Sequence, residues 1–280
     1  MARRPMMSRR LRRLRMGLAT LVGHKPQGFF IPYRRAAEMR RPHYDALEAR
    51  LHGCEAQFRK VLADADALAD DLLRIGADAP PEPRWKQDWF PPLDALAAYT
   101  MLRTLRPAQV VEIGAGHSTR FLARAVRDGG LATKITAIDP QPRADLSQLD
   151  VKFVRSTAQQ AGPERFAGLQ AGDFLIVDSS HVLVAGSDVD LVLNVLVPAL
   201  PSGVVLQFHD VFLPDDYPPE WRWRGYNEQQ GLGPLIAGWE VLFAGRYVAT
   251  RMQDAMAASV AGRLDAPKSP YESCLWLRKP

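Results

Sequence analysis

The sequence predicts an α/β fold in which a doubly wound, mainly parallel sheet is covered by helices on both faces. From residue 94 onward, short apolar segments rich in β-branched residues alternate with segments of helical periodicity. This alternation is typical of parallel sheets. The expected strands are 109–113, 134–139, 151–154, 173–178, 203–208, 239–243 and 273–277. The expected helices are 94–105, 118–128, 143–148, 187–199 and 228–237.

Three parts of different composition make up the expected domain organisation. Residues 1–23 are a basic arm expected to be disordered, since the first fifteen residues contain seven arginines and no acidic residue. Residues 24–92 combine an extended segment rich in proline with a helical extension, 43–75, in which leucines recur at helical spacing. Residues 93–280 hold the sheet. The helical extension can pack on the sheet domain, or it can pair with its copy in a homodimer.

Charge and cysteine content narrow the classes of partner. Outside the first fifteen residues the chain has 29 Lys+Arg and 31 Asp+Glu, so its globular part is near neutral. A nucleic-acid partner is therefore expected only through the arm, which could also contact anionic lipid. The two cysteines, Cys54 and Cys274, form neither a disulfide framework nor a zinc knuckle. No apolar stretch approaches the ~20 residues of a membrane span, and no export signal is recognised, so a cytoplasmic location is expected.

One strand–loop–helix segment organises the rest of the chain. Residues 109–113 are expected to be a buried strand, and Gly114 and Gly116 follow it directly. These glycines let the backbone turn and approach a ligand closely. Ser118 and Thr119 are good residues for the start of the next helix. Such a unit directs free backbone N–H groups and a helix dipole toward a polar ligand.

Polar residues gather where the expected strands end. They are Glu112 to Gly116, Asp139, Asp178 to His181, and His209 with Asp210. Ligands of open α/β sheets bind beyond these carboxyl ends, so the cluster predicts a binding site.

The spacing of the glycines distinguishes a dinucleotide-binding motif from one that binds S-adenosylmethionine. Asp139 lies 25 residues after Gly114, where an acid can accept hydrogen bonds from ribose hydroxyls. A dinucleotide fingerprint has a third glycine at position 119, which is Thr119 here. The carboxylate of Glu112 suits the ammonium group of S-adenosylmethionine. The pattern therefore favours S-adenosylmethionine over a dinucleotide.

Several motifs together resemble a class I S-adenosylmethionine-dependent methyltransferase, and within that class methyltransferase family 24. They are residues 112–119 (EIGAGHST), 137–139 (AID), 178–181 (DSSH), 186–189 (GSDV) and 208–214 (FHDVFLP). The resemblance implies a Rossmann-like sheet of about seven strands with a C-terminal antiparallel strand, preceded by N-terminal helices. It makes 93–280 the methyltransferase domain. The expected cofactor-binding residues are Glu112, Gly114, Ala115, Gly116, Ser118, Asp139 and Asp178.

The same resemblance implies a catalytic apparatus. Relatives that are metal-dependent O-methyltransferases hold Mg²⁺ at positions that correspond to Asp178, His209 and Asp210. His209 departs from that pattern, because Mg²⁺ prefers oxygen ligands and imidazole suits another divalent metal. Asp178 with His181 is similar to the Asp-x-x-His pattern of macrolide-sugar O-methyltransferases, which implies His181 as the general base. His209 is the second candidate.

The function predicted from the sequence is methyl transfer to a small-molecule acceptor, at a hydroxyl oxygen. Two aromatic groups, at 85–90 and 217–226, could line the acceptor pocket. The alternatives are an NAD(P)-dependent oxidoreductase, a nucleic-acid methyltransferase that uses the arm, and a non-catalytic binding module of the same fold. Thr119 and the lack of a Tyr-x-x-x-Lys pair speak against the first of these.

Overall fold

The computed structural model describes residues 9–23, 27–28, 33–76, 79–87, 89–266 and 271–280. Its residues divide into two compact units, 1–43 and 44–280. The first contains α1 (Arg9–Leu21) and the short helix η1 (Ala36–Glu38). Helix α1 lies within the arm for which the sequence predicts disorder, and its leucines recur every three or four residues as a helix requires. Parts of the expected extended segment, 24–26 and 29–32, lie outside the described residues.

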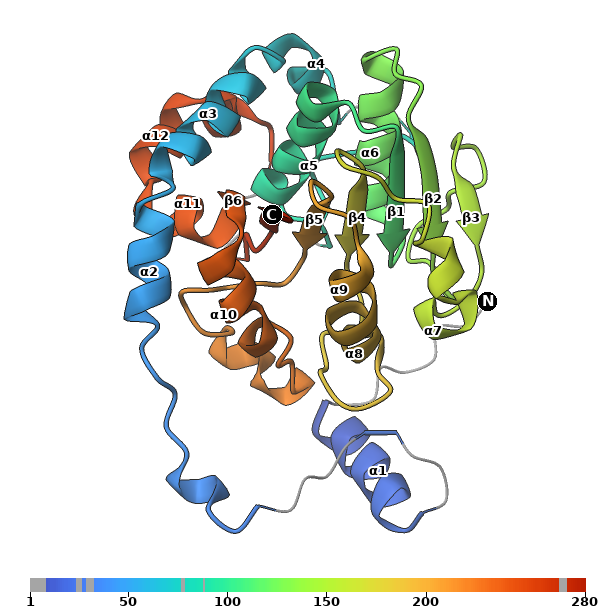
Figure 1. The fold of residues 1–280 in the computed structure, drawn as a ribbon, viewed down its shortest axis with the longest axis vertical. Helices are drawn as coiled ribbons and strands as arrows, with labels where there is room; N and C mark the ends of the chain where they lie inside the picture. Colours follow the sequence, from blue (N-terminus) through green and yellow to red (C-terminus); the bar gives the residue numbers. More distant parts are fainter. Residues whose placement is uncertain (1–8, 24–26, 29–32, 77–78, 88, 267–270) are drawn as a thin grey trace. The chain divides into compact units, whose positions relative to one another are not determined.

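The second unit is built on a seven-stranded sheet in the order β3-β2-β1-β4-β5-β7-β6 (Figure 1). Its strands are β1 (Gln109–Ile113), β2 (Lys134–Ile138), β3 (Lys152–Val154), β4 (Phe174–Val177), β5 (Val205–Phe208), β6 (Glu240–Ala244) and β7 (Leu275–Arg278). The first five strands are parallel, whereas β7 runs antiparallel between β5 and β6. The predicted fold class is therefore confirmed, including its C-terminal antiparallel strand.

Helices cover both faces of this sheet (Figure 1). The helices from residue 92 onward are α5 (Pro92–Leu105), α6 (His117–Asp128), α7 (Ala158–Ala161), α8 (Asp188–Leu191), η3 (Val192–Leu196), α9 (Val197–Ala199), α10 (Gln229–Gly238), α11 (Gly245–Arg251) and α12 (Gln253–Ala258), with the 3-10 helices η2 (Pro163–Arg165), η4 (Pro219–Arg224) and η5 (Val260–Arg263). Helices α8 and α9 are joined by η3, which is a π-helix, so the expected helix 187–199 is one continuous element. Of the described helices, none is long and apolar enough to cross a bilayer.

The helix expected at 143–148 is not formed. The side chain of Asp145 accepts a hydrogen bond from the backbone N–H of Ser147 at 3.0 Å. Asp139 does the same for the N–H of Gln141 at 2.6 Å. Because such side chains offer the backbone an alternative to helical hydrogen bonds, this segment is a series of turns.

The expected helical extension 43–75 is three helices rather than one. They are α2 (Asp45–His52), α3 (Glu55–Asp66) and α4 (Ala69–Leu73). Breaks at Gly53 and at residues 67–68 let each piece direct its own apolar side chains inward, so that Leu51, Phe58 and Leu72 are fully buried. Phe58 packs edge-on against Phe243 of β6, with ring centres 5.9 Å apart. The extension therefore packs on the sheet within its own unit.

The loop after β1 passes very close to the loop after β4. Gly114 has a φ of +85°, and a Cβ added there would lie 1.9 Å from the carbonyl oxygen of Asp178. Gly116 differs, since its φ of 174° is ordinary extended backbone and the nearest atom to an added Cβ is 3.9 Å away. Only the first of these two glycines is therefore required by the fold.

Replacing Gly114 by Ala should lower the free energy of unfolding by about 3 kcal/mol, because the new methyl group meets backbone and φ is unfavourable. The matched variant Gly116→Ala should change it by less than about 1 kcal/mol. Denaturant unfolding of both variants measures the difference. Equal stability of the two variants would contradict the close approach at Gly114.

Candidate active site

The carboxylate of Glu112 in β1 connects this strand to the first turn of α6 through hydrogen bonds. It is fully buried and accepts hydrogen bonds from Ser118 Oγ and Thr119 Oγ1, both at 2.6 Å. Thr119 Oγ1 also accepts the N–H of Gly116 at 3.0 Å. Burial raises the pKa of Glu112 to about 8, although the two hydroxyls oppose the shift. Glu112 and Ser118, both expected to bind the cofactor, satisfy each other's polar groups and shape the loop.

Asp139, at the end of β2, also holds this loop. Its Oδ2 accepts the N–H of Ala115 at 2.8 Å, and its Oδ1 accepts that of Gln141 at 2.6 Å. A carboxylate oxygen has two lone-pair directions, so each oxygen can accept one further hydrogen bond. Asp139 can therefore position the loop and still bind a ligand hydroxyl.

A small cavity joins the glycine loop to the end of β4. It is lined by Trp89, Phe90, Ala115, Gly116, His117, Ser118, Arg143 and Asp178. The guanidinium of Arg143 lies over the Trp89 ring, 4.4 Å from its centre. Burial, together with the charges of Arg120 and Arg84, lowers the pKa of His117 to about 4. The wall of the cavity thus carries a neutral imidazole, a cation on an aromatic face and a carboxylate.

His181 is held on every side by the loops after β4 and β5. Its Nδ1 lies 2.8 Å from Oε2 of Glu228, and its Nε2 lies 3.2 Å from Asp178 and 3.4 Å from Asp210. Its carbonyl oxygen accepts the N–H groups of Asn227 and Glu228. The residue is only 3% exposed and has a φ of +58°. This strained and buried position is maintained by the contacts around it.

His209, the second predicted base, occupies the same cluster. Its Nδ1 lies 3.3 Å from Oδ1 of Asp210 and 3.7 Å from Oδ1 of Asp178. Its Nε2 lies 3.2 Å from Oδ2 of Asp94, but the two groups are not oriented to form a hydrogen bond. The ring also packs against Phe90, with centres 5.3 Å apart.

Opposing effects set the charge of these imidazoles. Burial by itself lowers the pKa of His181 and His209, because it disfavours the charged form. The carboxylates of Asp210, Asp178 and Glu228 outweigh burial at His181 and raise its pKa well above the usual value. Asp178 and Asp210 do the same at His209. The two imidazoles in turn lower the pKa of Asp178 to about 2, against the effect of its burial.

The residues predicted to bind a metal come together without forming a magnesium site. Asp178 and Asp210 direct oxygens at the nitrogens of His181 and His209. Two imidazoles in such a set do not suit Mg²⁺, which prefers oxygen. Within the described ranges, no group of three or more His, Cys, Asp and Glu residues is arranged to hold a metal ion. We therefore derive no catalytic step from a metal.

Three further carboxylates, not predicted from the sequence, lie at or next to the two imidazoles: Asp94, Glu228 and Glu272. Asp94, taken as the start of a helix, is fully buried and accepts the N–H groups of Ser273 and Cys274. Glu272 accepts those of Leu93 and Asp94 at the start of α5. Glu228 holds His181. A signal for Asp94 was present, because it is the one charged residue in the apolar stretch 90–102.

The aromatic residues expected at the acceptor pocket lie in different places in the structure. Trp85 is 2% exposed and packs against Phe121, with ring centres 4.9 Å apart, so it belongs to the core. Trp89 is 54% exposed and lines the cavity. In the loop after β5, Tyr226 packs on the ring of His181 at 4.7 Å. The aromatic loop is therefore joined to the buried cluster.

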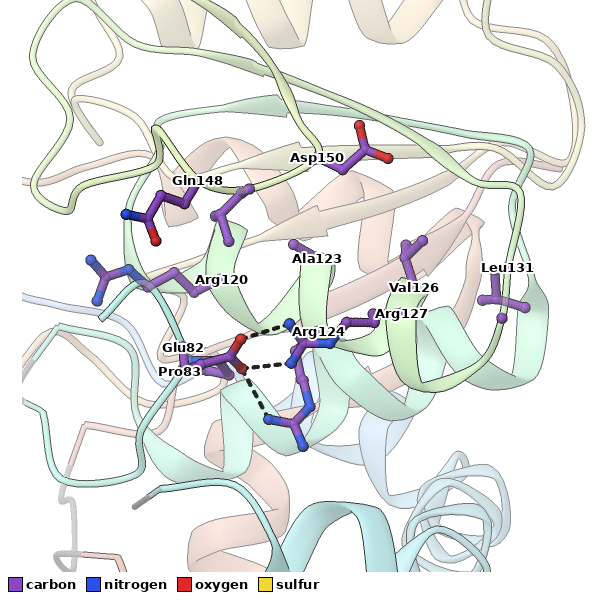
Figure 2. A pocket seen from close by; sticks show the side chains of 12 residues that line it. Glu82, Pro83, Arg120, Ala123, Arg124, Val126, Arg127, Leu131, Gln148 and Asp150 are labelled. Atoms are coloured by element: carbon purple, nitrogen blue, oxygen red, sulfur yellow. Dashed lines mark hydrogen bonds and ion pairs between the residues drawn. The ribbon is translucent and has the colours of Figure 1, made fainter. Parts of the chain in front are cut away.

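A second hollow lies along α6 and does not include the strand ends (Figure 2). Arg124 and Arg127 line it, and both pair with Glu82, at 3.0 and 2.6 Å. Figure 2 shows these contacts as dashed lines from one carboxylate to two guanidinium groups. Since these charges are matched within the protein, we assign the hollow no part in the candidate site.

Comparison with known proteins identifies the central part of the sheet domain. Residues 111–211 match a family model described as a methyltransferase domain. No curated protein matches the chain. Solved structures with a similar fold include the apo structure of CmcI-N160, with 14% identity over 91% of this chain and 86% of that chain and a TM-score of 0.41.

Two further structures are similar to the same extent. The S-adenosylhomocysteine-bound methyltransferase PaMTH1 of Podospora anserina has 15% identity over 90% of this chain and 99% of its own, with a TM-score of 0.41. The plantazolicin methyltransferase BpumL, in complex with a monoazolic desmethylPZN analogue and S-adenosylhomocysteine, has 13% identity over 84% of this chain and 96% of its own, with a TM-score of 0.40. These values are too low to bear on individual site residues. The family match runs from β1 to the residue after Asp210, so the likeness to a methyltransferase domain covers residues 111–211.

Proposed function

We propose that the protein transfers a methyl group from S-adenosylmethionine to a hydroxyl oxygen of a small-molecule acceptor. The observation that carries this proposal is the cavity that joins the glycine loop to Asp178, with His181 directly behind that carboxylate. The family match adds support for methyl transfer. Neither an oxidoreductase nor a non-catalytic module is favoured by these features.

The donor is proposed to bind at the carboxyl ends of β1 and β2. Asp139 would accept hydrogen bonds from the ribose hydroxyls, and the loop Gly114–Gly116 would face the donor with its backbone. Glu112 and Ser118 would act mainly by holding this loop in place, since their side chains bond to each other. Arg143 and Trp89 form a flat, charged wall beside the loop.

The reaction itself is an in-line displacement in which the acceptor oxygen attacks the methyl carbon and the sulfonium sulfur leaves as a thioether. Holding the two partners in line supplies much of the rate enhancement. The acceptor hydroxyl must also lose its proton. Asp178 lines the cavity and its side chain is 27% exposed, so it is placed to accept the hydroxyl hydrogen bond.

His181 is the proposed general base. Its Nε2 contacts Asp178, the carboxylate that lines the cavity. Its Nδ1 is held by Glu228, which leaves Nε2 directed toward Asp178 and Asp210. Only the neutral imidazole can accept a proton, and it becomes more abundant as pH increases. Because the pKa of His181 is raised, this change takes place at a higher pH than for an ordinary histidine. His209 is the second candidate, since it contacts the same Asp178 carboxylate.

Isothermal titration calorimetry should detect saturable binding of S-adenosylmethionine and none of NAD. Asp139→Asn should weaken donor binding about tenfold, because an amide is a poorer acceptor for the two ribose hydroxyls. The matched control is Asp150→Asn, an exposed acid just before β3, which should bind the donor normally. Saturable NAD binding with none of S-adenosylmethionine would refute the proposed function.

Replacing His181 by Ala should lower kcat by about 10²- to 10⁴-fold, the usual contribution of a general base, and leave donor affinity nearly unchanged. His43→Ala, an exposed histidine outside the sheet unit, serves as the control and should keep full activity. Calorimetry with the donor separates loss of catalysis from loss of binding. Unchanged turnover in the His181 variant would eliminate it as the base.

The pH profile of turnover tests whether Glu228 raises the pKa of His181. Turnover should rise as pH increases through the raised pKa of His181, because only its neutral form accepts a proton. Glu228→Gln removes a carboxylate that raises this pKa, so the rise should move to lower pH. Glu164→Gln, which changes an exposed acid of the short helix η2, should leave the profile in place. A Glu228→Gln profile identical to the parent profile would contradict this assignment.

A further inference from the structure

We propose that α1 (Arg9–Leu21) binds the surface of an anionic lipid bilayer, with its leucine side chains inserted between the headgroups. The proposal concerns the first unit alone and shares no residue with the candidate active site. Its failure would leave the proposed methyl transfer untouched.

The apolar side chains of α1 lie along one side of the helix. Leucines occur at positions 11, 14, 18 and 21, intervals of three and four residues that place them in one stripe. An α-helix turns by about 100° per residue, which places Arg12 and Arg13 on the side opposite the leucines. Arg15 lies at the boundary between the two sides. The helix is therefore amphipathic, with a basic polar face.

The burial of these side chains is the reverse of what a helix packed on a protein core shows. Leu14, Leu18 and Leu21 are 68%, 59% and 64% exposed. Met16 and Ala19, which lie away from the leucine stripe, are partly buried. The most apolar side of α1 is thus exposed, and a contiguous exposed apolar stripe indicates a binding surface.

Charge indicates which surface would bind. Residues 1–37 contain ten Lys+Arg and no acidic residue, whereas residues 38–280 contain 26 Lys+Arg and 31 Asp+Glu. Basic residues beside an apolar stripe complement an anionic leaflet, where each one near the surface adds to binding. The rest of the chain carries a net negative charge and would be repelled. The arm is therefore the part of the chain suited to contact the membrane.

A bilayer accounts for both faces of α1, whereas a nucleic acid accounts for only one. Phosphates would pair with the arginines and leave the leucines in water. A helix of 13 residues spans about 20 Å, which is too short to cross the hydrocarbon core. A helix with this pattern lies in the interface, with its apolar side buried at the headgroup boundary.

Vesicle flotation with the full-length protein tests the proposal. The protein should bind vesicles that contain phosphatidylglycerol and not vesicles of phosphatidylcholine alone. The double variant Leu14→Ser with Leu18→Ser should weaken binding to anionic vesicles roughly tenfold or more, since two leucines lose apolar burial. Arg12→Gln with Arg13→Gln should weaken it to a similar extent. Leu73→Ser, which changes a 44% exposed leucine of α4, is the matched control and should bind as the parent does.

Each remaining outcome would overturn the proposal. Binding that the leucine variant leaves unchanged would show attraction by charge alone, without insertion. Equal binding to neutral and anionic vesicles would remove the role of the arginines. Tight binding of the full-length protein to single-stranded RNA, without binding to anionic vesicles, would assign the arm to nucleic acid. A thermal denaturation midpoint lowered in the leucine variant but not in Leu73→Ser would show that the stripe packs on the protein itself.

Discussion

The pairing of two buried imidazoles with the carboxylates around them is the constraint on which the candidate site depends. His181 and His209 are almost completely removed from water, and Asp178 and Asp210 contact both. A charge left alone in such a place is costly, and removing one partner of a buried pair typically costs about 3–5 kcal/mol. Glu228 completes the pairing from the start of α10. The loops after β4 and β5 and the start of α10 must therefore be positioned together.

The C-terminal strand has a part in this arrangement. Because β7 inserts between β5 and β6, the residues just before it reach the start of α5. There the carboxylate of Asp94 accepts the N–H groups of Ser273 and Cys274, and that of Glu272 accepts two N–H groups from α5. Asp94 also lies 3.2 Å from His209. The antiparallel insertion thus connects the end of the chain to the imidazole cluster.

Hydrogen bonds within the protein hold the glycine loop after β1 in its shape. Glu112 bonds the hydroxyls of Ser118 and Thr119, Asp139 bonds the N–H of Ala115, and Gly114 passes against the backbone of Asp178. Polar groups that are already oriented need little reorganisation during a reaction. The polar residues of the motif therefore keep the loop in its shape, which leaves its backbone in a fixed orientation.

The sequence by itself determined the sheet and the strand ends that meet at its carboxyl edge, because buried strands and glycine turns are local patterns. It also located Asp139, Asp178, His181 and His209, since each follows a recognisable strand. Only the tertiary structure decided the partners of these residues. Asp94 and Glu272 come from positions 178 residues apart, and local patterns carry no information about such contacts. The extension 43–75 likewise forms three helices rather than one, and each piece buries its own apolar side chain: Leu51, Phe58 and Leu72. Burial and neighbouring charge, which exist only in the folded chain, set the protonation of His181.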